Sequence, residues 1–130
     1  MSSEEEVRRV FAEALAAQPP RPMSFVLYFV EGGDELTPES GQVLQQVFAE
    51  IGRRADFEIT VIGHTDRVGS VPFNDALSLR RAERVRAELT RLGVASGRIE
   101  VAGRGEREPL VPTEDEVAEP RNRRVEIIVR

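Results

Sequence analysis

The sequence contains no cysteine, no lysine and no apolar run long enough to span a membrane as a helix. The lack of cysteine excludes disulfides, thiolate metal sites, cysteine nucleophiles and a lipid-modified cysteine within this chain. All 18 basic residues are arginine, and 23 acidic residues outnumber them, so the net charge is −5. Because non-specific binding to nucleic acid depends on neutralising phosphates, this acidic balance argues against a nucleic-acid partner.

The N-terminal residues carry a helical pattern that ends in a proline-rich stretch. Ser3 and Glu6 form a capping box, and the proline-rich residues 18–22 predict a stiff linker. We favour a helix packed on the flank of the domain, with a connector or a dimer contact as the alternatives. The acidic start lacks the basic region of a signal peptide, so we expect any export signal or membrane anchor outside this chain. The apolar stripe of this helix comprises Val7, Val10, Phe11 and Ala14.

We therefore divide the chain into an N-terminal helix with its linker, residues 1–22, and one domain, residues 23–130. With 130 residues, 40% hydrophobic and 32% charged, the chain is long and apolar enough for one core. The predicted fold is α+β: a two-layer sandwich in which helices cover one face of a mixed four-stranded sheet, with a β-α-β-α-β-β core. We expect strands over 23–30, 57–63, 98–103 and 122–130, and helices over 37–52 and about 73–92.

The stretch from Ile59 to Ala82 predicts a strand, a polar turn and a helix, and we expect the strand to be covered on both faces. Asp66 follows the strand's carboxyl end, where open α/β sheets usually bind ligands. Arg81 lies on the apolar edge of the helix, which we expect to begin at Asn74 or Asp75 as N-cap. Asp66 and Arg81 fit opposite sides of a pocket for a zwitterion; the alternative from the pattern alone is a salt bridge between them.

The residues Gly63-His-Thr-Asp66, Asn74, Leu77-Ser78, Arg81-Ala82 and Asn122–Glu126 resemble, in order and spacing, the signature of the OmpA-like peptidoglycan-binding domain. This family includes the C-terminal domains of outer-membrane protein A, the peptidoglycan-associated lipoprotein and the flagellar motor protein MotB. The resemblance covers residues 24–130 and implies the same two-layer fold. It also implies that Asp66 and Arg81 hold the ammonium and carboxylate of diaminopimelate in the peptidoglycan stem peptide.

The resemblance extends to other positions around this site, each with a structural alternative. Asn74 borders the ligand in the family, although it also fits a helix N-cap, and Arg124 either borders the pocket or is an exposed strand arginine. The family usually has an aspartate after the phenylalanine of the first strand, where this chain has Val30. Backbone groups of that first loop remain available to a ligand. We assign the candidate ligand-binding set to Asp66, Arg81, Asn74, Thr65, Val68, Leu77 and Arg124.

The sequence gives little support to an enzyme. His64 is the only histidine, and without cysteine or a second nitrogen ligand it makes a poor metal site. No serine occupies a nucleophile elbow, and nothing fixes two carboxylates across one cleft. We therefore expect no cofactor, no metal and no catalysis, and we expect His64 to stabilise the turn.

Two functions remain open at this point. The first is a periplasmic, outer-membrane-associated module that anchors an envelope protein to peptidoglycan, joined to a membrane only through a segment outside this chain. The second is an OmpA-like structural or protein-interaction module that has lost wall binding, which the departure at Val30 keeps open. Homodimerisation is compatible with either function.

Overall fold

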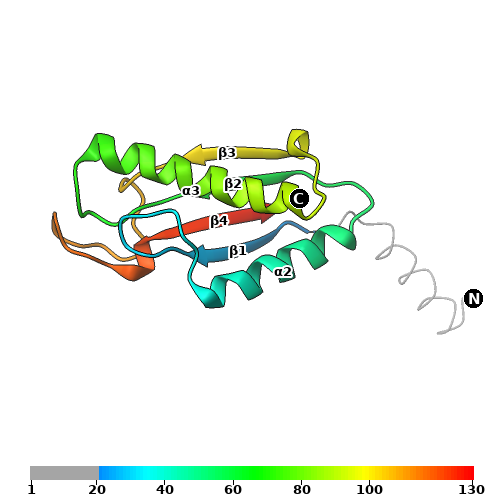
Figure 1. Ribbon diagram of the computed structural model, residues 1–130, viewed down its shortest axis with the longest axis horizontal. Coiled ribbons are helices and arrows are strands. Elements are labelled where there is room, and N and C mark those ends of the chain that lie inside the picture. Colours follow the sequence, from blue (N-terminus) through cyan, green and yellow to red (C-terminus); the bar gives the residue numbers. More distant parts are fainter. Residues whose placement is uncertain (1–20) are drawn as a thin grey trace, which may run out of the picture.

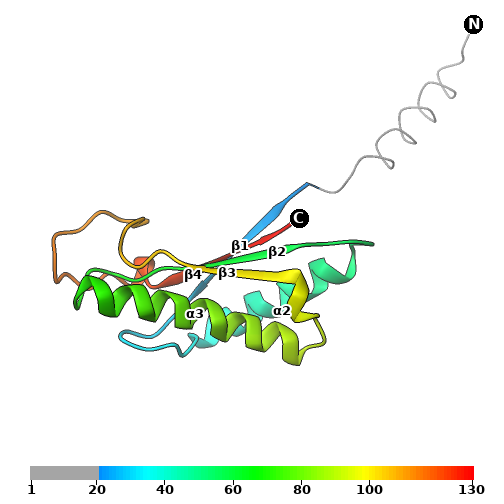
Figure 2. The ribbon, with the colours of Figure 1, turned by 90° about the horizontal axis from the view of Figure 1, so that it is seen from above.

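A mixed four-stranded sheet with two helices on one face forms the domain (Figure 1, Figure 2). The computed structural model describes residues 21–130, so the expected N-terminal helix lies outside the described residues. The elements are β1 (Met23–Tyr28), α2 (Pro38–Gly52), β2 (Ile59–Gly63), α3 (Val71–Arg91), η1 (Ser96–Arg98), β3 (Ile99–Gly103), η2 (Pro120–Asn122) and β4 (Arg124–Val129). This confirms the predicted α+β sandwich and its β-α-β-α-β-β order.

The strand order across the sheet is β1-β4-β2-β3. β4 runs antiparallel to both β1 and β2, whereas β2 and β3 are parallel and are joined through α3. β1, β2 and β3 therefore all point the same way, and their carboxyl ends share one end of the sheet. The loops that follow these three strands meet there, which places the turn containing Asp66 beside two loops distant in sequence.

The sheet buries only one face against helices, which corrects the expectation for β2. Its residues alternate between buried and half-buried, and the buried residues Ile59, Val61 and Gly63 lie on the face that packs against α3. No helix among residues 21–130 covers the opposite face (Figure 2). The β-branched run suggested a doubly covered strand, but β-branched residues also suit a half-exposed sheet face. The core comprises Leu27, Phe29, Leu44, Val47, Ile51, Ile59, Val61, Ala82, Val85, Leu89, Val94, Ile99, Val125, Ile127 and Val129.

The two helices begin differently from each other. α2 starts as predicted, with Thr37 as N-cap, and Pro38 in its first turn. α3 starts earlier than predicted, because Ser70 is the N-cap and its hydroxyl accepts the Phe73 N–H over 3.2 Å. The prediction of Asn74 or Asp75 as N-cap is therefore wrong: Pro72 at the helix start was the stronger signal. None of the helices in the described part is long and apolar enough to cross a membrane.

Two glycines let α3 lie directly on the sheet. A Cβ at Gly63 would overlap the Ser78 carbonyl, and one at Gly103 would lie 2.7 Å from the Leu79 backbone nitrogen. The Ser78 hydroxyl donates to the Asp75 carbonyl and accepts the Gly105 N–H, each over 2.8 Å. This close approach fixes the middle of α3 against the carboxyl ends of β2 and β3, and so sets the position of Arg81.

Candidate functional site

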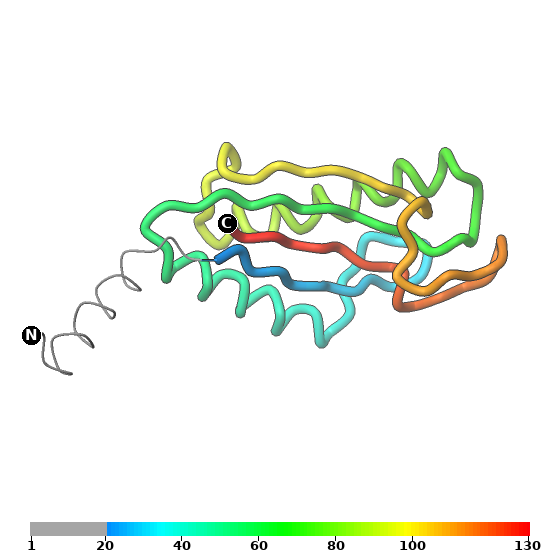
Figure 3. Tube along the Cα trace, turned by 180° about the vertical axis from the view of Figure 1, so that it is seen from behind, coloured from blue at the N-terminus to red at the C-terminus, as the bar shows by residue number. Residues whose placement is uncertain are grey.

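Three loops meet at the end of the sheet where β1, β2 and β3 finish: residues 29–37, 64–70 and 104–123 (Figure 1, Figure 3). The second of these joins the third through the bond from the Thr65 N–H to the Gly105 carbonyl, 2.9 Å long. The first loop folds back through the bridge between Phe29 and Leu36. The site predicted from sequence lies among these loops.

The Asp66 carboxylate is enclosed, and both of its oxygens accept hydrogen bonds from its own chain. Oδ2 accepts from Arg123 Nη1 over 3.1 Å and from the Glu119 N–H over 3.3 Å. Oδ1 accepts the Val68 N–H over 3.2 Å. Asp66 is 4% exposed, so a ligand reaches this carboxylate only if it replaces one of these donors.

Arg81 is fully buried, and its guanidinium is held by backbone carbonyls. Nε donates to Gly33, Nη1 to His64 and Nη2 to Val30, over 2.8, 2.9 and 3.1 Å. The guanidinium also lies 5.3 Å from the Phe29 ring centroid, within range of a cation–π interaction. Three of its five N–H groups are used in this way, and no carboxylate of the described residues forms a salt bridge with it.

Burial lowers the pKa of Arg81 to about 10, and the negative charge of Asp66 partly offsets this effect. The two side chains are therefore electrostatic neighbours, but they form neither a hydrogen bond nor a salt bridge with each other. The structure therefore lacks the direct Asp66–Arg81 ion pair that the sequence pattern offered as the alternative. Arg81 is the eleventh residue of α3, which places it too far from the helix N-terminus for the macrodipole to affect it.

Arg123 contacts the candidate site but was not among the residues predicted from sequence. Its side chain is 12% exposed, pairs with Asp66 and lines a surface pocket of about 530 Å³. Its Nε is buried without an acceptor among residues 21–130. The available signal was the Asn122-Arg-Arg sequence, which forms part of the family signature. The pocket is lined by Tyr28, Phe29, Val30, Glu31, Thr37, Pro120, Arg121 and Arg123.

Four of the other predicted residues lie around Asp66 and α3. Thr65 is buried, and its hydroxyl donates to the Asp66 carbonyl over 2.9 Å. Asn74 is also buried, and its Nδ2 donates to the same carbonyl over 3.2 Å. Val68 contributes its N–H to the Asp66 carboxylate, and Leu77 is buried on α3.

Arg124 lies apart from this group. It is 4% exposed, which rules out the exposed strand arginine considered above. Its Nη2 donates to the Glu108 carbonyl and to Glu126 Oε1, both over 3.0 Å. Because its neighbour Val125 faces the helices, strand alternation places Arg124 on the opposite face of the sheet. The structure therefore does not bring the Arg124 side chain to the Asp66 carboxylate.

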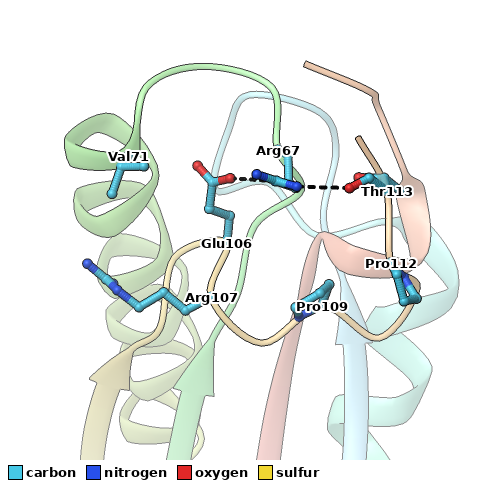
Figure 4. A pocket seen from close by; sticks show the side chains of 7 residues that line it. All are labelled: Arg67, Val71, Glu106, Arg107, Pro109, Pro112 and Thr113. Carbon is cyan, nitrogen blue, oxygen red and sulfur yellow. Dashed lines mark hydrogen bonds and ion pairs between the residues drawn. The ribbon is translucent and has the colours of Figure 1, made fainter. Parts of the chain in front are cut away.

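Residues 113–119, which we call the acidic strap, are fastened over the turn that follows β2. The Arg67 Nη1 group donates to the Thr113 carbonyl over 2.9 Å, and its Nη2 lies 2.6 Å from Asp115 Oδ1. The Glu116 N–H donates to the Arg67 carbonyl over 2.9 Å. Figure 4 shows the Arg67 side chain between Glu106 and Thr113, at the edge of a pocket of about 490 Å³. The strap therefore lies over the turn that contains Asp66 and Arg67, and its last residue, Glu119, donates its N–H to the Asp66 carboxylate.

His64 is buried beside this site and is neutral at pH 7. Its burial, reinforced by the positive charge of Arg124, lowers its pKa to about 4, while Glu126 acts in the other direction. Both ring nitrogens lack hydrogen-bond partners in the described part of the chain. Its backbone joins the turn to its neighbours, because the N–H donates to the Arg124 carbonyl over 2.8 Å and the carbonyl accepts from Arg81. Within residues 21–130, no group of three or more histidine, aspartate or glutamate side chains is placed to hold a metal ion.

Comparison with known proteins identifies relatives of this chain. It is 37% identical over 112 residues to an outer membrane protein of Gluconacetobacter diazotrophicus, which covers 82% of this chain and 30% of that protein. It is 34% identical to the outer-membrane lipoprotein YfiB of Pseudomonas aeruginosa, covering 82% and 64%. It is 31% identical to the sodium-type flagellar protein MotY of Vibrio parahaemolyticus, covering 78% and 35%. The chain thus corresponds to only part of the length of these relatives.

Solved structures show the same fold. The peptidoglycan-associated lipoprotein of Burkholderia pseudomallei matches with a TM-score of 0.73 at 28% identity, over 81% of this chain and 89% of that one. The C-terminal domain of Helicobacter pylori MotB matches with a TM-score of 0.70 at 22% identity, over 82% and 84%, which supports the fold alone. The family model of the OmpA family matches residues 28–123. The chain therefore belongs to the OmpA family.

Proposed function

We propose that this chain is a non-catalytic peptidoglycan-binding module of the cell envelope, which holds the diaminopimelate of a stem peptide between Asp66 and Arg81. The observation that carries the proposal is the state of Arg81. The Arg81 guanidinium is fully buried, and its contacts are with neutral groups, the carbonyls of three residues and the Phe29 ring. A carboxylate that reached it would therefore form a charge-assisted pair in a buried site. A ligand carboxylate supplies that anion, and Asp66 supplies the matching acceptor for a ligand ammonium.

The relatives support the kind of partner and the location. One structural neighbour is named a peptidoglycan-associated lipoprotein, and its sequence is 28% identical to this chain over the matched region. Outer membrane proteins and an outer-membrane lipoprotein are among the sequence relatives. These names support an envelope location, and we propose that the module lies in the periplasm and is associated with the outer membrane through a segment outside this chain.

Binding of the ligand requires an exchange at Asp66. In this structure Arg123 and the Glu119 N–H occupy Oδ2, where the ligand ammonium would bind. The ammonium therefore replaces Arg123, whose side chain moves into the pocket beside Val30. The Glu119 N–H of the acidic strap also releases Asp66 Oδ2. Thr65, Val68, Asn74 and Leu77 then contact the remainder of the amino-acid headgroup. Because one headgroup in such a site offers limited buried area, we expect reversible binding.

The alternative is an OmpA-like interaction module without wall binding. Two observations favour it: the enclosure of Asp66 by its own chain, and the absence of a carboxylate at Val30, whose side chain is 44% exposed. Homodimerisation would suit this alternative, with one copy as the partner of the other.

Titration of the protein with a stem tripeptide that contains meso-diaminopimelate, followed by amide shifts, separates the two functions. We expect shifts at Thr65, Val68 and the Gly33 amide, and their loss in Asp66→Asn, which keeps the size of the side chain. Asp56→Asn is the matched control, because Asp56 is exposed and lies at the far end of the sheet. A titration without shifts in the wild-type protein, together with no retention on purified sacculi, would reject wall binding in favour of the interaction module.

A further inference from the structure

A second surface feature lies at the opposite end of the domain from the Asp66 site. There the carboxyl-terminal end of α2 and the loop after α3 enclose a hollow of about 620 Å³, which we call the Phe48 groove. Its walls are largely apolar, and Phe48 is 38% exposed. The Arg98 guanidinium lies 5.5 Å from the centroid of the Phe57 ring on the rim. Residues that line the groove include Phe48, Ile51, Ala55, Phe57, Val94 and Arg98.

The groove adjoins the point where the N-terminal segment enters the domain. Arg54, which also lines the groove, donates from Nη2 to the Arg21 carbonyl over 2.7 Å. Its side chain is 3% exposed, and its Nε has no acceptor among residues 21–130. A buried guanidinium N–H without an acceptor costs free energy, so an acceptor supplied from outside the described residues would stabilise the fold.

The twenty residues before Arg21 carry an apolar stripe of the size that such a groove accommodates. Val7, Val10, Phe11 and Ala14 recur at helical spacing. Ala14 is seven residues from Arg21, and seven residues span at most about 25 Å, so the stripe reaches the groove without any rearrangement of the domain. A tether of this length also gives a local concentration on the order of millimolar, which a second molecule in dilute solution does not match.

We propose that the Phe48 groove is the docking site for the apolar stripe of the protein's own N-terminal segment, with Phe11 as its main anchor. The segment covers the exposed faces of Phe48 and Phe57, and it provides acceptors near Arg54. Docking there fixes the direction in which the chain leaves the domain, on the side away from the Asp66 site. The assignment is independent of wall binding, because the two surfaces lie at opposite ends of the sheet (Figure 1).

The absence of cysteine allows a direct test by disulfide trapping in the full chain. The test pair is Ala14→Cys with Ala55→Cys on the groove, and the control pair is Ala14→Cys with Ala118→Cys in the acidic strap at the far end. We expect an intramolecular cross-link in the first pair, at a rate independent of protein concentration, and none in the second. Cross-linked dimers whose yield rises with concentration would instead assign the groove to a second copy and overturn the proposal.

A third variant separates docking from mere closeness of the tether. Phe11→Asp, added to the test pair, leaves the tether unchanged but places a charge on the apolar contact. We expect cross-linking about tenfold slower, because a charged side chain in place of Phe11 loses the apolar burial that favours the docked state. The same slowing is expected from Phe48→Asp on the groove side. An unchanged rate in both variants would show that the segment passes the groove without occupying it.

Discussion

The Arg123 guanidinium donates to Asp66 Oδ2 over 3.1 Å, at the carboxylate where the proposed ligand places its ammonium. Both side chains are largely buried, at 12% and 6% exposure. The protein without ligand thus neutralises Asp66 with its own cation. Binding exchanges one cation for another, which keeps the carboxylate paired in both states and limits the net affinity for diaminopimelate.

Removal of Arg123 tests this exchange. Arg123→Ala leaves Asp66 as a buried charge without its partner, so we expect a loss of roughly 3 kcal/mol in the free energy of unfolding. The same variant should bind meso-diaminopimelate more tightly than the wild type, because no internal cation has to leave. Urea denaturation with and without the ligand measures both effects. Arg121→Ala, which removes a highly exposed arginine two residues earlier, is the control and should change neither the stability nor the affinity. An Arg123→Ala protein with the stability and affinity of the wild type would contradict the exchange.

The close contact between α3 and the sheet at Gly63 predicts that alanine substitutions at two glycines change the stability in opposite directions. Gly63→Ala should cost roughly 3 kcal/mol or more of stability, because the new Cβ meets the Ser78 backbone, which cannot yield as a side chain does. Gly41→Ala in α2 has open space around the new methyl and should stabilise by about 0.5–1 kcal/mol. Chemical denaturation of the two variants provides the measurement. Similar stabilities for both would show that α3 does not approach β2 this closely.

The elements that a periodic pattern specifies were predicted from sequence, and the contacts that tertiary packing decides were not. The start of α2 was correct because Thr37 and Pro38 are a local signal, and β4 was correct because Val125, Ile127 and Val129 alternate. The burial of β2 on one face only depends on where helices lie, which its residues do not encode.

The site divides in the same way. The place of Asp66 after β2 follows from strand-turn-helix order alone. Its partner Arg123 comes from 57 residues away through the pairing of β4 with β2, and no local pattern reveals that contact. The bonds from Arg81 to the carbonyls of Gly33 and Val30 depend on how the first loop folds back, which is likewise a long-range matter.

His64 predicts a dependence of stability on pH. Its pKa is about 4 in the folded protein, below its ordinary value of 6.5, because the charged form is excluded from the buried site. The unfolded chain therefore binds more protons between these values, so stability is complete above about pH 6.5 and falls as the pH drops toward 4. The slope should approach about 1.4 kcal/mol per pH unit, the value for one proton. Urea denaturation of His64→Gln should show no dependence of the free energy of unfolding on pH between 6.5 and 5. An unchanged dependence would show that carboxylates, and not His64, cause it.

Val30 is the position where this chain departs from the aspartate that OmpA-like domains usually carry, and it lies beside the buried guanidinium. Its carbonyl accepts from Arg81 Nη2 over 3.1 Å, while its side chain lies at the edge of the pocket that Arg123 also lines. Val30→Asp therefore adds a second carboxylate near the proposed ammonium position without disturbing the backbone contact. A new charge-assisted hydrogen bond should raise the affinity for meso-diaminopimelate about tenfold.

Calorimetric titration of Val30→Asp beside Val30→Asn separates charge from shape at this position. The asparagine has nearly the same size and hydrogen-bonding reach but no charge, so it should leave the affinity close to that of the wild type. If the affinity for meso-diaminopimelate rises equally in both variants, the improvement comes from removal of the exposed valine side chain rather than from an ion pair. If neither gains, the ligand ammonium does not approach the first loop, and the headgroup then lies deeper, between Asp66 and the amides of Thr65 and Val68.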